Sequence, residues 1–501
     1  MAACILSKLM IFLSLICIIS NAHLQSKEDG FISVSISEKG LEFLKDLLTE
    51  KAVSSLTPLE LSPIEKTVRI LLIGRVKIVL SNIIIYHIDV PYSNVEVGDD
   101  EITISALKAT ANLSMDWKYT YQNWFVEVSD QGKASVEVED MKVGMKVSLK
   151  NQGGALKLSL EDSKCDIEDV DIKMDGGASW LYQGVVDAFS DHIESAVENG
   201  ILKKLTEGIS KIGSLLQSLP TEIKVDDTSA LNVTFVSDPI FSDSSVGFII
   251  NGLFVPMNGA LTTPYRHQIS QASVPCYTPA RMIAMSLHED VFNSASLVYF
   301  NAGLMQWRVD RIPDQSLLNT TEWKEVVPQL YEHFPNAGMV LDILVTSPPF
   351  VHVFDGEMEA TINTDVTIDV VSDAEVIPVA CGSVVISASG SVDIAGNNLT
   401  GGIELDKFNL SAKWSKIGDL QIDDIKPVIS EVLDDVLLPR LNQLLVQGFP
   451  LPLIHGFTVE DAEIVYSDSV ITVCSDVAFA EDYKLPAKYS ISDIFPFRLF
   501  M

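Results

Sequence analysis

Apolar residues recur at helical spacing in three segments of the chain. Near the N-terminus, residues 41–48 place several leucines on one face. A much longer stripe runs through residues 181–219 and stops at Pro220, and a third occupies residues 422–447 and ends at Gly448. The pattern therefore predicts one short helix and two long helices, each with an apolar face.

Alternation of apolar and polar residues occurs in the stretches between these helices. Between residues 68 and 170 it predicts a curved antiparallel sheet with one apolar face. The alternation slips by one residue at Glu139–Asp140, which indicates a bulge that bends the strand. Similar alternation returns in residues 360–371 and 379–394, so a second sheet is predicted in the second half of the chain.

A further apolar segment, residues 289–305, precedes the second set of strands. With it, the order helix, strands, long helix, proline occurs twice, about 240 residues apart, which indicates a duplicated unit. A helix of 40 residues would be roughly 60 Å long, so the first unit is elongated or its helix bends near Gly200 or Gly208. We assign residues 23–235 to the first unit and residues 276–501 to the second. Residues 236–275 are expected to join the two units through structure of their own.

The second long helix has an unusually wide apolar face, because Leu438 and Val446 lie beside its main stripe. Pro439 is expected to kink this helix, since its ring clashes with the carbonyl group of Asp435. A wide apolar face against a sheet is either part of a thick protein core or the wall of an apolar cavity. The pattern alone favours a core.

The first 22 residues have the features of a secretory signal peptide. Lys8 precedes an apolar run from Leu9 to Ile19, and small residues at Ser20 and Ala22 form a cleavage site. The alternative is an uncleaved membrane anchor. No later stretch reaches eighteen apolar residues without a charge, so the mature protein is expected to be soluble, secreted and extracellular.

Composition narrows the function classes. The 501 residues include 68 acidic and 35 basic side chains, and the formal net charge is −33. This excess of acid argues against nucleic acid as a partner, because phosphates bind cationic surfaces. The familiar catalytic motifs are absent, so an enzyme is the weaker class and no cofactor is predicted. His288-Glu289-Asp290 is interpreted as a surface turn, not as a metal site, while the many carboxylates leave a glycosidase pair open.

Secretion would make the later cysteines candidates for disulfide bonds, and several sequons candidates for glycosylation. Three pairings stay open for the cysteines. They are Cys165, Cys276, Cys381 and Cys474. The sequons begin at Asn112, Asn232, Asn319, Asn398 and Asn409.

Four segments resemble the bactericidal/permeability-increasing and lipopolysaccharide-binding protein family, the tubular lipid-binding proteins, and its plant members in particular. They are KGLEFLKDLL at 39–48, HIESAVENGILKKL at 192–205, VFNSASLVYFNAGLM at 291–305 and DVLLPRLNQLLVQGFPLPL at 435–453. The resemblance implies an α+β fold, a boomerang of two similar barrels joined by a central sheet. Each barrel would hold a long helix against a twisted antiparallel sheet, with a pocket for lipid acyl chains between them.

The resemblance also implies two sets of lipid-binding residues. With this family fold, the apolar helix faces become walls of acyl pockets, not solid core. The acyl-pocket set comprises Leu41, Leu44, Leu48, Phe189, Ile193, Val197, Val432, Val436, Leu437, Leu441 and Leu445. The headgroup set, expected at the tip of the first barrel, comprises Arg69, Arg75, Lys77, Lys118, Lys150, Lys157, Trp117, Tyr119, Tyr121 and Trp124.

Two departures from the family pattern bear on these expectations. Cys165 matches one partner of a family disulfide, but Thr206 stands where the second cysteine would be, so Cys165 is unpaired or paired differently. Endotoxin-binding members carry many cations at the barrel tip, whereas the matching loop at 116–128 has Lys118 as its one cation, among aromatic residues. These aromatics suit a membrane interface or a sugar, or else form a partly buried hairpin cluster.

The sequence thus predicts a secreted, glycosylated lipid-binding protein of innate immune defence, with lipopolysaccharide or phospholipid as ligand and a bacterial or membrane surface as partner. One alternative is a phospholipid carrier without a role in defence. Another is an interaction glycoprotein with solid cores that binds a receptor or a cell-wall polymer through its aromatic loop. The apolar C-terminal tail, residues 490–501, is expected to plug a pocket opening or to pack elsewhere.

Overall fold

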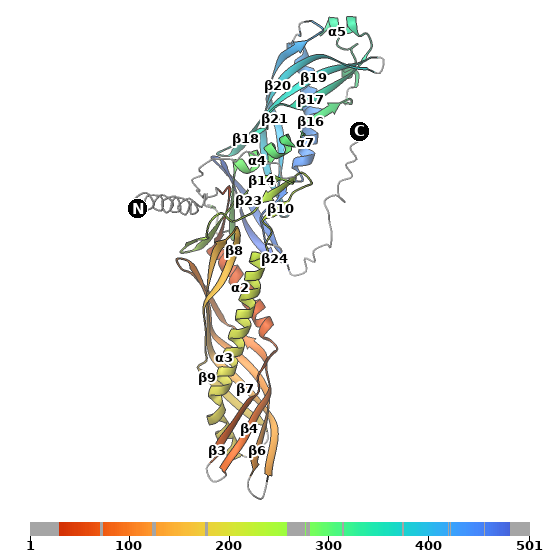
Figure 1. Cartoon of the computed structure of the whole chain (residues 1–501). Helices are drawn as coiled ribbons and strands as arrows, with labels where there is room; N and C mark the ends of the chain where they lie inside the picture. Colours follow the sequence, from red (N-terminus) through yellow and green to blue (C-terminus); the bar gives the residue numbers. More distant parts are fainter. Residues whose placement is uncertain are drawn as a thin grey trace, which may run out of the picture.

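The computed structural model describes residues 30–480, apart from short gaps. The gaps are 71–73, 123–126, 176–178, 258–275, 277–280, 313–314, 373–374, 419, 421 and 455. The predicted signal peptide, Trp124 and the C-terminal tail lie outside the described residues. The described chain forms an elongated, bent molecule with a helix-on-sheet barrel at each end (Figure 1).

The first barrel wraps one antiparallel sheet around a long helix. The sheet has the order β2-β4-β6-β7-β8, with β3 paired to β4, β5 to β6 and β9 to β7. Its strands are β2 (Leu59–Leu61), β3 (Ile64–Ile70), β4 (Gly74–Asp89), β5 (Tyr92–Val97), β6 (Glu101–Gln122), β7 (Glu127–Gln152), β8 (Ala155–Asp166) and β9 (Asp169–Asp175). Helix α2 (Glu38–Leu56) precedes the sheet, and α3 (Ser179–Gln217) follows it and runs along its length (Figure 1).

The predicted long helix and the predicted bulge are both confirmed in this barrel. Helix α3 has 39 residues, which corresponds to about 58 Å at 1.5 Å per residue. On β7, Val138 pairs with Ala111 and Met141 with Ala109, so β7 holds one more residue than β6 across this step. Asp140 within it has a positive φ of 49°. The bulge bends two very long strands around the helix.

The second barrel repeats this plan. Its sheet has the order β16-β17-β19-β20-β21-β22, with β18 paired to β19. The strands are β16 (Gln306–Val309), β17 (Gly338–Val345), β18 (Phe350–Phe354), β19 (Glu357–Ser372), β20 (Glu375–Ala395), β21 (Asn398–Ser415) and β22 (Phe449–Pro450). Two short helices, η1 (Gln315–Leu318) and α5 (Pro328–His333), lie between β16 and β17.

The second long helix is distorted where Pro439 was predicted to kink it. It comprises α6 (Ile422–Val432), a π-helical turn η2 (Leu433–Leu437) and α7 (Leu438–Leu445). The N–H of Leu438 donates to the carbonyl of Leu433, five residues earlier. Proline has no N–H with which to continue an α-helical ladder, and the wider turn accommodates it. The π turn changes which side chains of α7 face the sheet.

A six-stranded central sheet joins the barrels, in the order β12-β13-β1-β15-β24-β23. Its strands are β1 (Ile32–Ser37), β12 (Ile240–Ser242), β13 (Ser245–Ile250), β15 (Ile283–His288), β23 (Phe457–Ser467) and β24 (Val470–Phe479). Beside it lie helix α4 (Glu289–Asn301) and a small sheet of β10 (Glu222–Lys224), β11 (Ser229–Asn232) and β14 (Phe254–Pro256). The predicted connecting segment, 236–275, thus supplies only part of the central sheet. The rest comes from regions that sequence analysis had placed in the two barrels.

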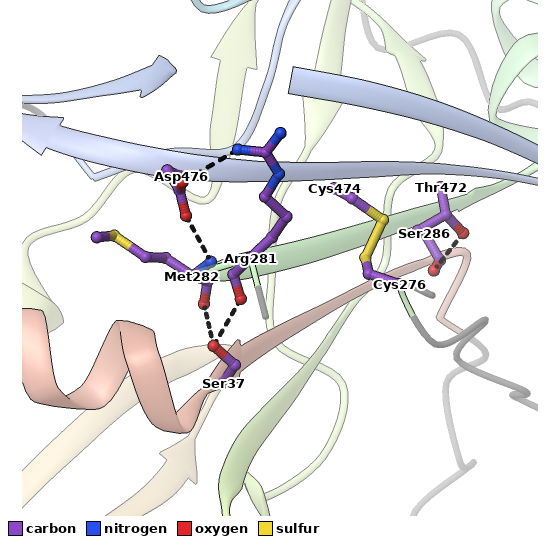
Figure 2. Close-up of a disulfide and its surroundings, with 8 residues drawn as sticks. All are labelled: Ser37, Cys276, Arg281, Met282, Ser286, Thr472, Cys474 and Asp476. Atoms are coloured by element: carbon purple, nitrogen blue, oxygen red, sulfur yellow. Dashed lines mark hydrogen bonds and ion pairs between the residues drawn. A yellow bond between two sulfur atoms is a disulfide. The ribbon is translucent and has the colours of Figure 1, made fainter. Parts of the chain in front are cut away.

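A disulfide and a group of polar contacts hold the centre of this sheet together (Figure 2). Cys276 is bonded to Cys474 of β24. Ser37, which caps α2, donates a hydrogen bond from its hydroxyl to the carbonyl of Arg281, at 2.6 Å. The carboxylate of Asp476 accepts from the N–H of Met282 and from the Arg281 guanidinium, both at 3.1 Å.

The Asp476 carboxylate also accepts from Lys39 at 2.9 Å. Partial burial acts to raise its pKa, but the hydrogen bonds from Lys39, Met282 and Arg281 outweigh burial and lower the pKa below the usual 3.8. A lowered carboxyl pKa contributes stability above the unfolded-state value, and that contribution is lost as pH falls through the folded-state value. We expect Asp476→Asn to destabilise the protein at pH 7, with the difference shrinking below pH 3.8. Denaturant titrations of both proteins from pH 7 to pH 2.5 measure it; a constant difference would contradict this account.

Candidate functional site

The predicted acyl-pocket residues of α3 lie deep inside the first barrel. Phe189, Ile193 and Val197 are at most 1% exposed and belong to one apolar cluster with the inner faces of β4, β6 and β7. Spacing of four residues places all three on the same helix face. The contact between α3 and the sheet, the apolar seam of this barrel, is therefore made by closely packed apolar side chains.

The three leucines of α2 that were predicted to line the pocket do not join this seam as a group. Leu41 is buried, Leu44 is half-buried and Leu48 is 36% exposed. Leu48 therefore lies outside the buried cluster of this barrel, and its place in an acyl pocket stays a prediction. Lys45 takes a buried position one turn earlier, where its ammonium group donates to the carboxylate of Glu42. Helical spacing alone did not reveal that a lysine would occupy the inner face.

In the second barrel, most of the predicted pocket residues are internal. Val432, Val436 and Leu437 are buried in its apolar cluster, and Leu441 packs against it. Leu445 was expected on the same inner stripe but is 39% exposed, which corrects that prediction.

The π turn explains the position of Leu445. An extra residue in one turn rotates all following side chains around the helix axis. Consequently Asn442 faces the sheet, where its side-chain amide accepts from the N–H of Ile403 at 2.7 Å and donates to the Ile403 carbonyl at 2.9 Å. Leu444 and Val446 are 52% and 67% exposed, so the end of α7 presents an apolar turn to solvent.

Four of the predicted headgroup cations lie together on the outer face of the first barrel's tip. Arg69 pairs with Arg75 across β3 and β4, near the end of β3 and the start of β4. Lys77 is two residues further along β4, and Lys118 lies on the neighbouring strand β6. All four are exposed. Lys77 forms an ion pair with Glu65 at 2.5 Å, whereas no carboxylate among the described residues pairs with the other three.

Lys150 and Lys157 lie elsewhere. They face each other across β7 and β8 next to the hairpin that ends at Ala155. Lys118 lies opposite Gln131 of β7, nineteen residues before Lys150. At about 3.3 Å per residue, this is roughly 60 Å along the strand. The prediction that these two lysines contribute to the tip is wrong, because β7 spans the whole barrel.

The aromatic residues of the predicted loop belong mainly to the core. Strand β6 continues to Gln122, so residues 117–121 form strand and not loop. Trp117 is 1% exposed, donates from its indole N–H to the carbonyl of Lys133 at 3.1 Å and stacks on Tyr119, itself 7% exposed. Tyr121 is half-buried against the same cluster. Direct headgroup contact by Trp117 and Tyr119 is therefore excluded in this structure, which corrects that expectation.

The pairing of the cysteines is now defined within the described residues. Cys165 and Cys381 are free and buried. Cys165 lies on β8, and burial raises the pKa of its thiol to about 12, with Glu198 and Asp166 adding to the effect. Of the two expectations for Cys165, unpaired or paired differently, the structure shows the first.

The sequons differ in accessibility. Asn409 on β21 is exposed. The other four asparagines are half-buried, and Asn232 accepts hydrogen bonds from the Thr234 N–H and hydroxyl at 3.0 and 2.7 Å. Asn409 is therefore the most accessible acceptor. Its use, like that of the others, stays a prediction.

The triplet at residues 288–290 forms the start of α4, where His288 caps the helix by accepting from the Asp290 N–H. Glu289 accepts from the Val353 N–H at 2.9 Å and contacts His352. In the part of the chain that the structure describes, no cluster of three or more metal-ligating side chains occurs. The triplet thus has a structural role at the junction of central sheet and second barrel.

Sequence reasoning missed a hollow of about 340 Å³ on the second barrel, lined by residues of the helix around the π turn and of the segment after β16. Two arginines, Arg311 and Arg440, contribute to it. They are 129 positions apart in the sequence, and no local pattern connects them. Of the two, only Arg440 lies in a segment on which the family resemblance rests, residues 435–453.

Comparison with known proteins agrees with this architecture. The family model described as the LBP / BPI / CETP family, N-terminal domain, matches residues 40–236, and the corresponding C-terminal domain model matches residues 223–479. A crystal structure of lipopolysaccharide-binding protein superposes with a TM-score of 0.62 at 18% identity, covering 90% of this chain and 99% of that one. The fold is therefore the α+β fold of this family.

Relatives extend over nearly the whole chain. A BPI/LBP family protein of Arabidopsis thaliana is 47% identical over 462 residues, covering 91% of this chain and 94% of that protein. Bactericidal permeability-increasing protein of Sebastes schlegelii is 25% identical, covering 89% and 95%. Human lipopolysaccharide-binding protein is 23% identical, covering 85% and 89%. The chain belongs to the LBP / BPI / CETP family, and the predicted resemblance and fold are confirmed.

None of the described helices is long and apolar enough to cross a membrane.

Proposed function

We propose that this protein is secreted and glycosylated, that it buries lipid acyl chains in the apolar interiors of its two barrels, and that it recognises lipopolysaccharide in innate immune defence. The observation that carries the recognition step is the cationic outer face formed by Arg69, Arg75 and Lys118. These three cations, for which the described residues provide no carboxylate partner, gather on a chain of net charge −33. Lipopolysaccharide presents phosphates, which guanidinium and ammonium groups bind through charge-assisted hydrogen bonds.

Burial of hydrocarbon supplies the driving force in this proposal. Each buried CH₂ group contributes about 0.8 kcal/mol, so a chain of fourteen carbons would contribute on the order of 10 kcal/mol before entropy losses. The apolar seam around Phe189, Ile193 and Val197 supports the proposal for the first barrel. The seam around Val432, Val436 and Leu437 supports it for the second.

A second candidate is phospholipid carriage without a defence role. The exposed apolar turn at the end of α7, with Leu444, Leu445 and Val446, favours it. Such a turn can insert among acyl chains whatever the headgroup. By contrast, the burial of Trp117 and Tyr119 takes away two of the four aromatic side chains on which the non-lipid alternative depended.

Lipid content distinguishes lipid carriage from solid cores. We expect the full-length secreted protein, extracted with organic solvent, to release acyl lipids that mass spectrometry detects at near-stoichiometric amounts. Protein that is purified without bound lipid is incubated with lipopolysaccharide or with phosphatidylcholine vesicles and isolated again. Recovery of neither lipid after loading would exclude both candidates, and recovery of phosphatidylcholine alone would favour the carrier.

A further inference from the structure

The hollow on the second barrel brings together two arginines from distant parts of the chain. Arg311 follows β16, and Arg440 lies in the first turn of α7. Both side chains are exposed, and neither has an ion-pair partner among the residues described. Many other cations of this acidic protein do have one, such as Lys39 with Asp476 and Lys413 with Asp365. Two unpaired guanidinium groups at one hollow therefore form a local cationic site.

The remaining lining divides into a polar and an apolar part. Asp435 contributes a carboxylate, which leaves the hollow with a net formal charge of about +1. Gln443 adds an amide donor. Ile312 and Val436 also line the hollow and are 8% and 7% exposed. Both belong to the apolar cluster of the second barrel, so the floor of the hollow is continuous with the barrel interior.

The helix is irregular at this site. Asp435 and Val436 lie within the π turn Leu433–Leu437, and Pro439 follows it directly. A π turn is a rare feature of α-helices and is frequently found at functional sites. Here the turn places one carboxylate and one apolar side chain beside Arg440, at the seam between helix and sheet.

We propose that this hollow binds the phosphate headgroup of an anionic amphiphile, with Arg311 and Arg440 as its ligands and an acyl chain over Ile312 and Val436. The inference rests on the proposed function, which it deepens by naming a headgroup class and a site for the second barrel. Guanidinium groups bind phosphate oxygens in pairs of parallel hydrogen bonds. The apolar floor favours an amphiphile over free phosphate, because free phosphate would gain nothing from it.

The test uses the full-length protein in a background that carries Arg69→Gln, Arg75→Gln and Lys118→Gln, so that the tip of the first barrel does not contribute. Dihexanoyl phosphatidic acid, which stays monomeric, is the probe, and isothermal calorimetry measures its Kd. Adding Arg311→Gln and Arg440→Gln together is expected to raise Kd at least tenfold. The matched control, Arg308→Gln, removes an arginine that pairs with Asp342, and it should leave Kd unchanged.

A second variant tests the sign of the charge effect. Asp435→Asn removes the one carboxylate of the hollow and is expected to lower Kd severalfold, which loss of folding could not produce. Unchanged Kd in both the double arginine variant and Asp435→Asn would overturn the proposal. Equal, arginine-dependent binding of inorganic phosphate would also overturn it, in favour of a free-anion site. Dihexanoyl phosphatidylcholine separates failure of this site from failure of the proposed function. If this lipid binds without depending on the arginines, lipid carriage stands even where the phosphate site fails. If neither lipid binds, the proposed function itself is contradicted.

Discussion

Removing the disulfide between Cys276 and Cys474 is expected to destabilise the protein more than any other single covalent change. The bond joins residues separated by 198 positions. Closing a loop of that length lowers the entropy of the unfolded chain by an amount worth about 5 kcal/mol in the chain-entropy account. Cys276→Ala combined with Cys474→Ala should therefore lower the midpoint of guanidinium-induced unfolding substantially.

Two controls separate the bond from the packing of its sulfur atoms. Cys381→Ala removes a buried thiol that forms no disulfide, and it should cost about 1 kcal/mol. Dithiothreitol should lower the unfolding midpoint of the unmodified protein while leaving the double alanine variant unaffected. Equal midpoints for the double variant and Cys381→Ala would show that the disulfide adds little to the stability of the central sheet.

The parts of the fold that follow local periodicity could be predicted. The stripe through Phe189, Ile193 and Val197 identified a helix, and the slip at Glu139–Asp140 identified a bulge, because each depends on neighbours within one or two turns. The central sheet depends on pairing between β1 and β15, some 250 residues apart. The sequence pattern within a strand does not indicate which distant strand it pairs with, so the assignment of this sheet to residues 236–275 was incomplete.

In the candidate site, too, some positions follow from local periodicity and others do not. Trp117 and Tyr119 continue the alternation of Leu113 and Met115 on the inner face of β6, so the sequence held a signal for their burial. This alternation was not used, because residues 116–128 were expected to form a loop. Leu445 carried no such signal, because its exposure follows from the π turn and from the rotation of Asn442 toward the sheet.

The position of Lys150 and Lys157 depends on strand length. A hairpin that follows a strand of ordinary length would lie near the other loops of a compact domain. Strand β7 has 26 residues, against five or six in a typical strand, so its two ends lie at opposite ends of the barrel. Residues near the far end of β7 therefore cannot act with residues near its first end, and the cationic tip reduces to Arg69, Arg75, Lys77 and Lys118.

Charge reversal at this tip is expected to have the largest effect on lipopolysaccharide binding. Arg69→Glu, Arg75→Glu and Lys118→Glu replace the three unpaired cations on the outer face of β3, β4 and β6. An exposed cation contributes about 1 kcal/mol to binding a phosphate, so losing three should weaken affinity about 100-fold, before repulsion is added. Surface plasmon resonance on immobilised lipopolysaccharide measures this change.

The salt dependence of binding provides an independent reading of the same site. Contacts between exposed charges weaken as ionic strength rises, so the affinity of the unmodified protein should fall between 50 and 300 mM salt, and that of the triple variant should change little. Lys150→Glu, Lys157→Glu and Lys164→Glu form the matched control, since they alter the net charge equally while lying on β7 and β8, well away from the position of β7 that pairs with Lys118. A control variant that loses as much affinity as the tip variant would show that net charge, and not the position of Arg69, Arg75 and Lys118, governs binding. Unchanged affinity in the tip variant would place the lipopolysaccharide site elsewhere on the molecule.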